Sequence, residues 1–82
     1  MSREKKPTLF FSFPTTFAAM EAERICKEAG IPGRLVPIPR EITAGCGLAW
    51  MSEPEQEPAI RAFFRSRQLQ FEGSTILEFF WH

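Results

Sequence analysis

The spacing of apolar residues changes along this chain from a period of two to a period near 3.6, and it does so twice. In TLFFSF, residues 8–13, Leu9, Phe11 and Phe13 share one face, as in a strand. The run after Pro14 has helical spacing instead. The second half repeats this change. The pattern predicts strands at residues 8–13, 33–38, 46–51 and 75–81 and helices at residues 16–29 and 55–68.

The first predicted helix has recognisable ends. Thr15 or Thr16 can cap its start, and Gly30 can end it. Its apolar residues fall on one stripe, comprising Ala18, Ala22, Ile25, Cys26 and Ala29. Cys26 is therefore expected to be a buried, inert thiol.

The second predicted helix starts less clearly. Ser52 and Glu55 have capping-box spacing, but Pro58 follows within the first turns. Either this first turn is irregular or the regular helix begins near Glu57, where the missing N–H of Pro58 does no harm. Its buried side is expected to carry Ile60, Phe63 and Phe64.

The element order is strand, helix, strand, strand, helix, strand, within one domain covering residues 1–82. This order predicts an α+β fold of the ferredoxin-like βαββαβ arrangement, an antiparallel four-stranded sheet with two helices on one face. The first and third strands are then central. Pro37 agrees with an edge position for the second strand, because proline cannot donate to a ladder on both sides.

The chain is rich in aromatic residues, and one sheet face has no helix to cover it. Nine Phe and two Trp are more than a single helix-covered face is expected to absorb. Exposed aromatic patches of this kind mark association, so the sequence predicts a homodimer through the aromatic-rich sheet face or the last edge strand. The alternative is tight packing that hides every ring. The candidates for this open face or edge are Phe10, Trp50, Phe79, Phe80 and Trp81.

Charge and cysteine content narrow the class of protein. Ten basic residues balance ten acidic ones, which argues against a nucleic-acid partner. Two cysteines are too few for a secreted disulfide framework, so a cytoplasmic location fits best. The apolar run near the start is broken by Pro14, Thr15 and Thr16, so it is too short for a signal peptide. The chain contains no longer apolar run that could span a bilayer, so we expect no membrane partner.

The second cysteine, Cys46, lies between Gly45 and Gly47 at the expected start of the third strand. Flanking glycines permit positive φ angles and let another molecule approach the sulfur. Backbone amides there can form an anion-binding nest, and Arg40 is near enough in sequence to add positive charge, so a thiolate would be favoured. The alternative is a small buried side chain beside a turn. Spacing alone does not separate the two.

The other polar residues are weaker candidates for a functional site. Arg40 and Glu41 can orient a ligand or simply pair with each other at the surface. His82 is the only histidine, and the sequence gives no reason to pair it with either cysteine. The chain has no phosphate loop, nucleophile elbow, paired-carboxylate pattern or metal motif. We therefore expect no cofactor and no metal, and find no basis for a hydrolase or kinase.

The stretch PIPREITAGCG, residues 37–47, preceded by KEAGIP at residues 27–32, resembles the small bacterial family of selenium/sulfur carrier-like proteins. The resemblance covers roughly residues 9–73. It implies that Cys46 is the carrier thiol, with Arg40, Thr43, Gly45 and Gly47 as its loop neighbours. The chain departs from the family pattern at SEPEQEP, which carries an extra residue and proline, and at its aromatic end, ILEFFWH.

The resemblance implies a carrier more than a true enzyme. Cys46 would take sulfur or selenium from a donor enzyme as a persulfide or selenosulfide and pass it to an acceptor protein. The alternative from another class is a non-catalytic ligand-binding or protein-interaction module, whose work would survive Cys46→Ser. An RNA-binding module shares the element order, but CGLAWM lacks the basic and aromatic motif of that class.

Overall fold

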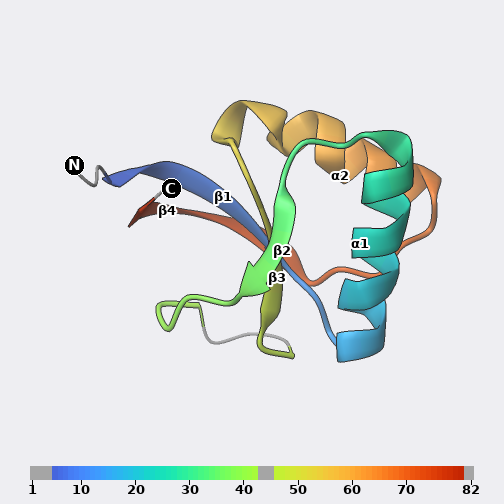
Figure 1. The fold of residues 1–82 in the computed structure, drawn as a ribbon, viewed down its shortest axis with the longest axis horizontal. Coiled ribbons are helices and arrows are strands. Elements are labelled where there is room, and N and C mark those ends of the chain that lie inside the picture. Colours follow the sequence, from blue (N-terminus) through green and yellow to red (C-terminus); the bar gives the residue numbers. More distant parts are fainter. Residues whose placement is uncertain (1–4, 43–45, 81–82) are drawn as a thin grey trace.

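The computed structural model describes residues 5–42 and 46–80 of the chain (Figure 1). It has a four-stranded antiparallel sheet and two α-helices, which confirms the α+β class. In chain order the elements are β1 (Lys5–Ser12), α1 (Thr16–Ala29), β2 (Arg34–Pro37), β3 (Leu48–Ser52), a 3₁₀ turn η1 (Pro54–Gln56), α2 (Glu57–Ser66) and β4 (Gly73–Phe80).

Helix α1 has the bounds that the sequence predicts, whereas other elements differ. β1 starts at Lys5 because it pairs with β4 from Lys5 to Ser12. The strand predicted at residues 46–51 begins only at Leu48, after Gly47 with its φ of 92°. The helix predicted at residues 55–68 is shorter at both ends. The 3₁₀ turn precedes it, and Gln68, with a φ of 57°, lies just beyond its end.

The strands lie in the order β2-β3-β1-β4, so β1 and β3 are central and Pro37 lies on an edge strand, as predicted. The register sets which side chains share a face. Phe11 lies opposite Trp50, and Leu9 lies opposite both Ser52 and Ile76. Because opposite residues of antiparallel strands point to the same side, Trp50 joins Phe11 on one face.

That face carries what we call the helix-side core, to which both helices contribute. Trp50 is completely buried there, so it does not lie on the helix-free face. Cys26 is also buried, as predicted, whereas Phe63 is half-buried and Ala29 is exposed. The buried members of the helix-side core are Leu9, Phe11, Phe13, Ala18, Ala19, Ala22, Cys26, Trp50, Ile60 and Phe64.

The helix ends test the capping predictions. Thr15 caps α1 by accepting a hydrogen bond from the Ala18 amide at 3.0 Å, and Gly30 ends the helix with a φ of 73°. The capping box at Ser52 is wrong, because Ser52 ends β3 and its hydroxyl donates to the Pro32 carbonyl at 3.0 Å. α2 begins at Glu57 with Pro58 in its first turn, which is the other start that the sequence allowed.

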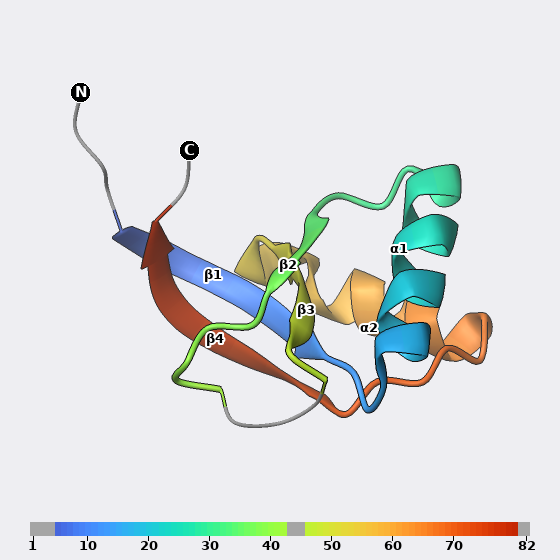
Figure 2. The ribbon, with the colours of Figure 1, turned by 60° about the horizontal axis from the view of Figure 1, so that its bottom comes forward.

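The opposite face of the sheet holds a second apolar cluster, which we call the second-face cluster. Phe10, Ala49 and Met51 are at most 1% exposed. The half-buried residues that cover them are Val36, Ile38, Ile42, Leu77 and Phe79. The loop of residues 38–42 thus lies over the face that no helix covers (Figure 2).

This covering corrects the expectation of an open aromatic face. The ring of Phe10 is buried and packs edge-on against Phe79, with centroids 5.2 Å apart. Neither the side chain of Phe80 nor Trp81 is among the parts that the structure describes. Among the described aromatic residues, those on this face are therefore wholly or partly covered within the chain.

A polar cluster fastens α2 to β4. Arg61 donates hydrogen bonds to the Glu57 carboxylate at 2.7 Å and to the Ser74 hydroxyl at 2.6 Å. The guanidinium of Arg61 also lies 5.6 Å from the ring centroid of Phe11 and 5.4 Å from that of Phe71. These partners come from α2, from β1, from β4 and from the segment between α2 and β4. The cluster ties α2 to β4.

Candidate functional site

Cys46 lies between β3 and the loop of residues 38–42, which we call the covering loop, and its backbone is bonded to the residue that follows β1. The Cys46 amide donates to the carbonyl of Phe13 at 3.1 Å. Phe13 follows β1 directly and comes two residues before Thr15, the cap of α1. In both ribbon views the chain just ahead of β3 lies next to the start of α1 (Figures 1 and 2). Cys46 is therefore placed beside the N-terminal end of a helix.

The side chain of Cys46 is half-buried and packs against the helix-side core. Its neighbour Gly47 has a φ of 92°, a conformation that side chains rarely adopt, and a Cβ atom there would meet nothing within 4 Å. The Gly47 side of the turn is thus open.

The loop before Cys46 is held on the other side of the sheet. Ile38 and Ile42 pack on the second-face cluster, and the Ile38 amide donates to the Gly47 carbonyl at 2.9 Å. A turn closed by the Ile42 amide and the Pro39 carbonyl, 2.9 Å apart, presents Arg40 and Glu41 to solvent. The loop therefore passes from one face of the sheet to Cys46 on the other.

This path separates groups that the sequence placed together. Arg40 has no hydrogen bond or ion pair with Cys46, or with any other residue in the described ranges. It also makes no ion pair with Glu41, the partner suggested by their adjacency. Thr43 and Gly45 lie outside the described residues, so their predicted roles stay predictions.

The expected nest of backbone amides around the sulfur is wrong in one respect. The Cys46 amide is already bonded to Phe13, so it is not free to bind an anion. Sequence reasoning missed Phe13 as an anchor, since it looked only like the last apolar residue of a strand.

Cys26 is buried, whereas Cys46 is half-buried. Cys26 is fully buried in the helix-side core, and burial raises the pKa of its thiol from 9.0 to about 11. A neutral thiol is a poor nucleophile, and no solvent reaches this one. Cys46 is thus the one of the two cysteines that another molecule can reach.

We expect the two thiols to react at very different rates. In native protein near pH 8, iodoacetamide should label Cys46 readily and label Cys26 only after denaturation, because burial both shields Cys26 and keeps it protonated. Labelling of Cys26 should increase only when the pH is raised toward 11, because its thiol ionises near that pKa. Peptide mapping after timed quenching measures both rates, and native labelling of Cys26 ahead of Cys46 would reverse the assignment.

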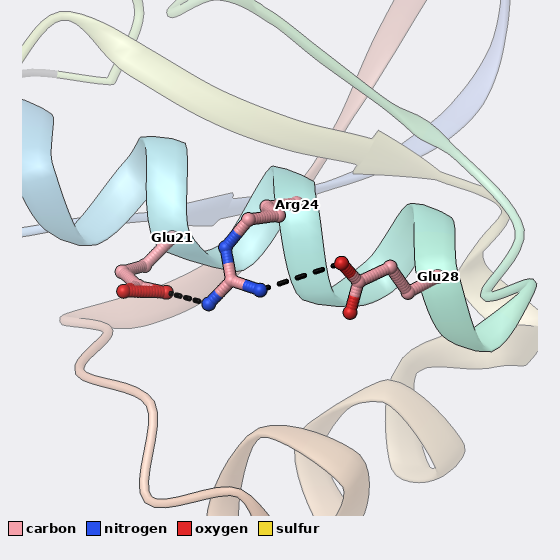
Figure 3. Close-up of polar contacts among 3 residues, drawn as sticks. All are labelled: Glu21, Arg24 and Glu28. Carbon is pink, nitrogen blue, oxygen red and sulfur yellow. Dashed lines mark hydrogen bonds and ion pairs between the residues drawn. The ribbon is translucent and has the colours of Figure 1, made fainter.

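A groove of about 490 Å³ lies elsewhere, between α1 and residues 67–70. Arg24, which lines this groove, bonds Glu21 at 2.6 Å and Glu28 at 3.4 Å (Figure 3). The hydrogen bond to Glu21 is the main cause that raises the pKa of Arg24. These charges are solvated and satisfy one another along the helix. None of the residues that line this groove belongs to the Cys46 turn.

The described parts of the chain show neither a metal site nor a membrane-spanning helix. Residues 5–42 and 46–80 contain no group of three or more His, Cys, Asp or Glu side chains placed to hold a metal ion. Across those same ranges, neither helix has the length and apolar character needed to cross a membrane.

Comparison with known protein families gives a match. The family model described as "Putative Se/S carrier protein-like" matches residues 8–75, which is most of the chain and includes β1 from Thr8 onward, the covering loop and Cys46. Comparison with curated proteins and with solved structures gives no match.

Proposed function

Because the chain belongs to the Se/S carrier-like family, we propose that it carries sulfur or selenium on a single thiol, that of Cys46. The observation that carries this choice is the contrast between the two cysteines. Cys46 is half-buried beside an open glycine, whereas Cys26 is fully buried with a raised pKa. A carrier must meet two partner proteins in turn, and a buried thiol meets neither.

The transfer step is a displacement at sulfur. The Cys46 thiolate attacks the terminal sulfur of a persulfide on the donor protein, an S–S bond forms to Cys46, and the donor's S–S bond breaks to release its thiolate. The terminal atom moves at an unchanged oxidation level, so no external oxidant or reductant is needed. A donor selenosulfide reacts in the same way and leaves a selenosulfide on Cys46.

Release follows the reverse pattern. A nucleophile on the acceptor protein attacks the terminal sulfur or selenium, and the Cys46 thiolate leaves. A good leaving thiolate speeds this step, so any support for negative charge on Cys46 favours release. We propose that the start of α1, which follows the Phe13 anchor in the chain, lends such support, because a helix N-terminus favours anions nearby.

The neighbouring loop residues have positioning roles in this proposal. Gly47 keeps one side of the sulfur clear, and Gly45 is proposed to do the same on the other. Thr43 and Arg40 are proposed to meet the partner protein, with Arg40 presented to solvent by the turn at residues 39–42. Since Arg40 has no contact with Cys46 in the described chain, its effect on loading should be modest.

The setting of the carrier is also part of the proposal. We propose a bacterial protein that acts in the cytoplasm as a single domain, where reducing conditions keep both cysteines as free thiols. The finer fold is proposed to be ferredoxin-like, supported by the element order and by the central places of β1 and β3. In this proposal the chain acts as a carrier more than as a true enzyme, because its part is to hold the atom between donor and acceptor.

Intact mass spectrometry tests the proposal. Reduced protein is incubated with a cysteine desulfurase and cysteine, or with a selenocysteine lyase and selenocysteine. The mass should rise by one sulfur or one selenium atom and return to the starting value after treatment with a thiol reductant. A binding module without covalent chemistry would keep its mass with every donor, and that result would contradict the carrier function.

A further inference from the structure

The two edges of the sheet are protected very differently. β2 forms one edge over only 4 residues, begins with the exposed Arg34 and ends with Pro37. Short length, charge and proline are the usual means by which an edge strand avoids pairing with another chain. β2 therefore has all three.

β4 forms the other edge and has almost none of this protection. It is 8 residues long, it contains no proline, and Glu78 is its one charged residue. β1 pairs with it along its whole length, but no other described strand pairs with its outer side. The backbone groups on that side are therefore a template for a further strand.

Ile76 lies near the middle of this edge and is 53% exposed. Its position opposite Leu9 in β1 places it on the helix side of the sheet. Among the described residues, Ile76 does not belong to the apolar side chains packed on either cluster, so this large side chain is left mostly in solvent. It fits a surface that another copy of the same surface would cover.

We infer that β4 pairs antiparallel with β4 of a second copy of this chain about a two-fold axis, joining the two sheets into one. A two-fold pair uses the same strand edge on both copies, so a single edge suffices. With Ile76 opposite Ile76 of the second copy, Glu78 faces Ser74, and no like charges meet. The central apolar pair then lies on the helix side and stabilises the join.

This pairing leaves the carrier thiol free. Cys46 is bonded to Phe13, just beyond the end of β1 at which Ser12 pairs with Gly73. Antiparallel strands put their Gly73 ends at opposite ends of the joined sheet, so each Cys46 faces away from the other. The inference is consequently independent of loading, and either can fail without the other.

Sedimentation velocity of the full chain tests the inference from about 10 μM to about 1 mM, because a small strand-to-strand interface binds weakly. Wild type should shift from monomer to dimer over this range. Ile76→Lys puts two lysines opposite each other in place of the apolar pair and should weaken dimerisation by about tenfold or more.

The matched control is Met20→Lys. Met20 is exposed by 58% on α1, so the substitution makes the same change in charge and polarity at a similar exposure away from β4. It should leave dimerisation unchanged. Circular dichroism checks the fold of both variants, and amide hydrogen exchange in wild type should show protection of β4 that grows with concentration.

Several outcomes would overturn the inference. If wild type is monomeric at every concentration, β4 does not pair with a second copy, and its edge would be open to a strand of another protein. Dimers that persist in Ile76→Lys, or that are lost in Met20→Lys, would place the contact elsewhere. If Ile76→Lys fails to fold, hydrogen exchange of wild type still decides. Amide protection that grows with concentration in α1 alone would place the contact away from β4.

Discussion

Cys46→Ser is expected to abolish loading by any sulfur or selenium donor, reducing the adduct to background in intact mass. The hydroxyl of serine is not ionised near neutral pH and forms no persulfide. Because Cys46 is half-buried and serine is close to it in size, the fold should remain intact, which circular dichroism checks. Full loading of this variant would show that Cys46 is not the carrier.

The matched variant at the other thiol is Cys26→Ala. Alanine suits this site better than serine, because a hydroxyl buried in the helix-side core would lack a hydrogen-bond partner. Cys26→Ala should load as wild type does, since Cys26 is buried and protonated. Loss of loading in Cys26→Ala, with its fold preserved, would contradict the assignment.

The largest expected effect on stability is at Gly33. Its φ is 126°, and a Cβ atom there would meet the Met51 carbonyl oxygen and lie 2.6 Å from Nε1 of Trp50. Trp50 cannot easily move aside, because that nitrogen donates to the Pro32 carbonyl at 3.1 Å and its ring is completely buried. Backbone strain and overpacking each cost about 1–3 kcal/mol, so Gly33→Ala should lose roughly 3 kcal/mol or more of unfolding free energy.

Gly30→Ala separates these two causes. Gly30 also has a positive φ, of 73°, but a Cβ atom there would meet nothing within 4 Å. Only the cost of the left-handed conformation remains, which is about 1–2 kcal/mol. Urea denaturation of both variants measures the difference. Equal losses at the two glycines would mean that Trp50 and Met51 yield without cost.

The periodic parts of the chain could be predicted well from sequence. α1 has its predicted bounds because its stripe, its Thr15 cap and its Gly30 end all agree. The start of α2 was ambiguous because Ser52 has the chemistry of a cap, and only the long-range bond to Pro32 shows it to be the end of a strand. Local sequence does not encode such a contact.

The site was only partly predictable for the same reason. The glycine beside Cys46 indicated an open turn, and the stripe of α1 indicated that Cys26 is buried; both are observed. The anchoring of the turn by Phe13 and the folding of Ile38 and Ile42 over the second face depend on tertiary packing. Sequence proximity therefore put Arg40 closer to the sulfur than the structure supports.

The most direct test of the carrier account is peptide-level mass spectrometry of the loaded wild-type protein. The protein is loaded by a desulfurase with cysteine, its free and modified thiols are alkylated, and it is digested without reductant. The extra sulfur should lie on the peptide that contains Cys46, with the Cys26 peptide unmodified. An extra atom on Cys26, or on neither peptide with the protein folded and the donor active, would contradict the account.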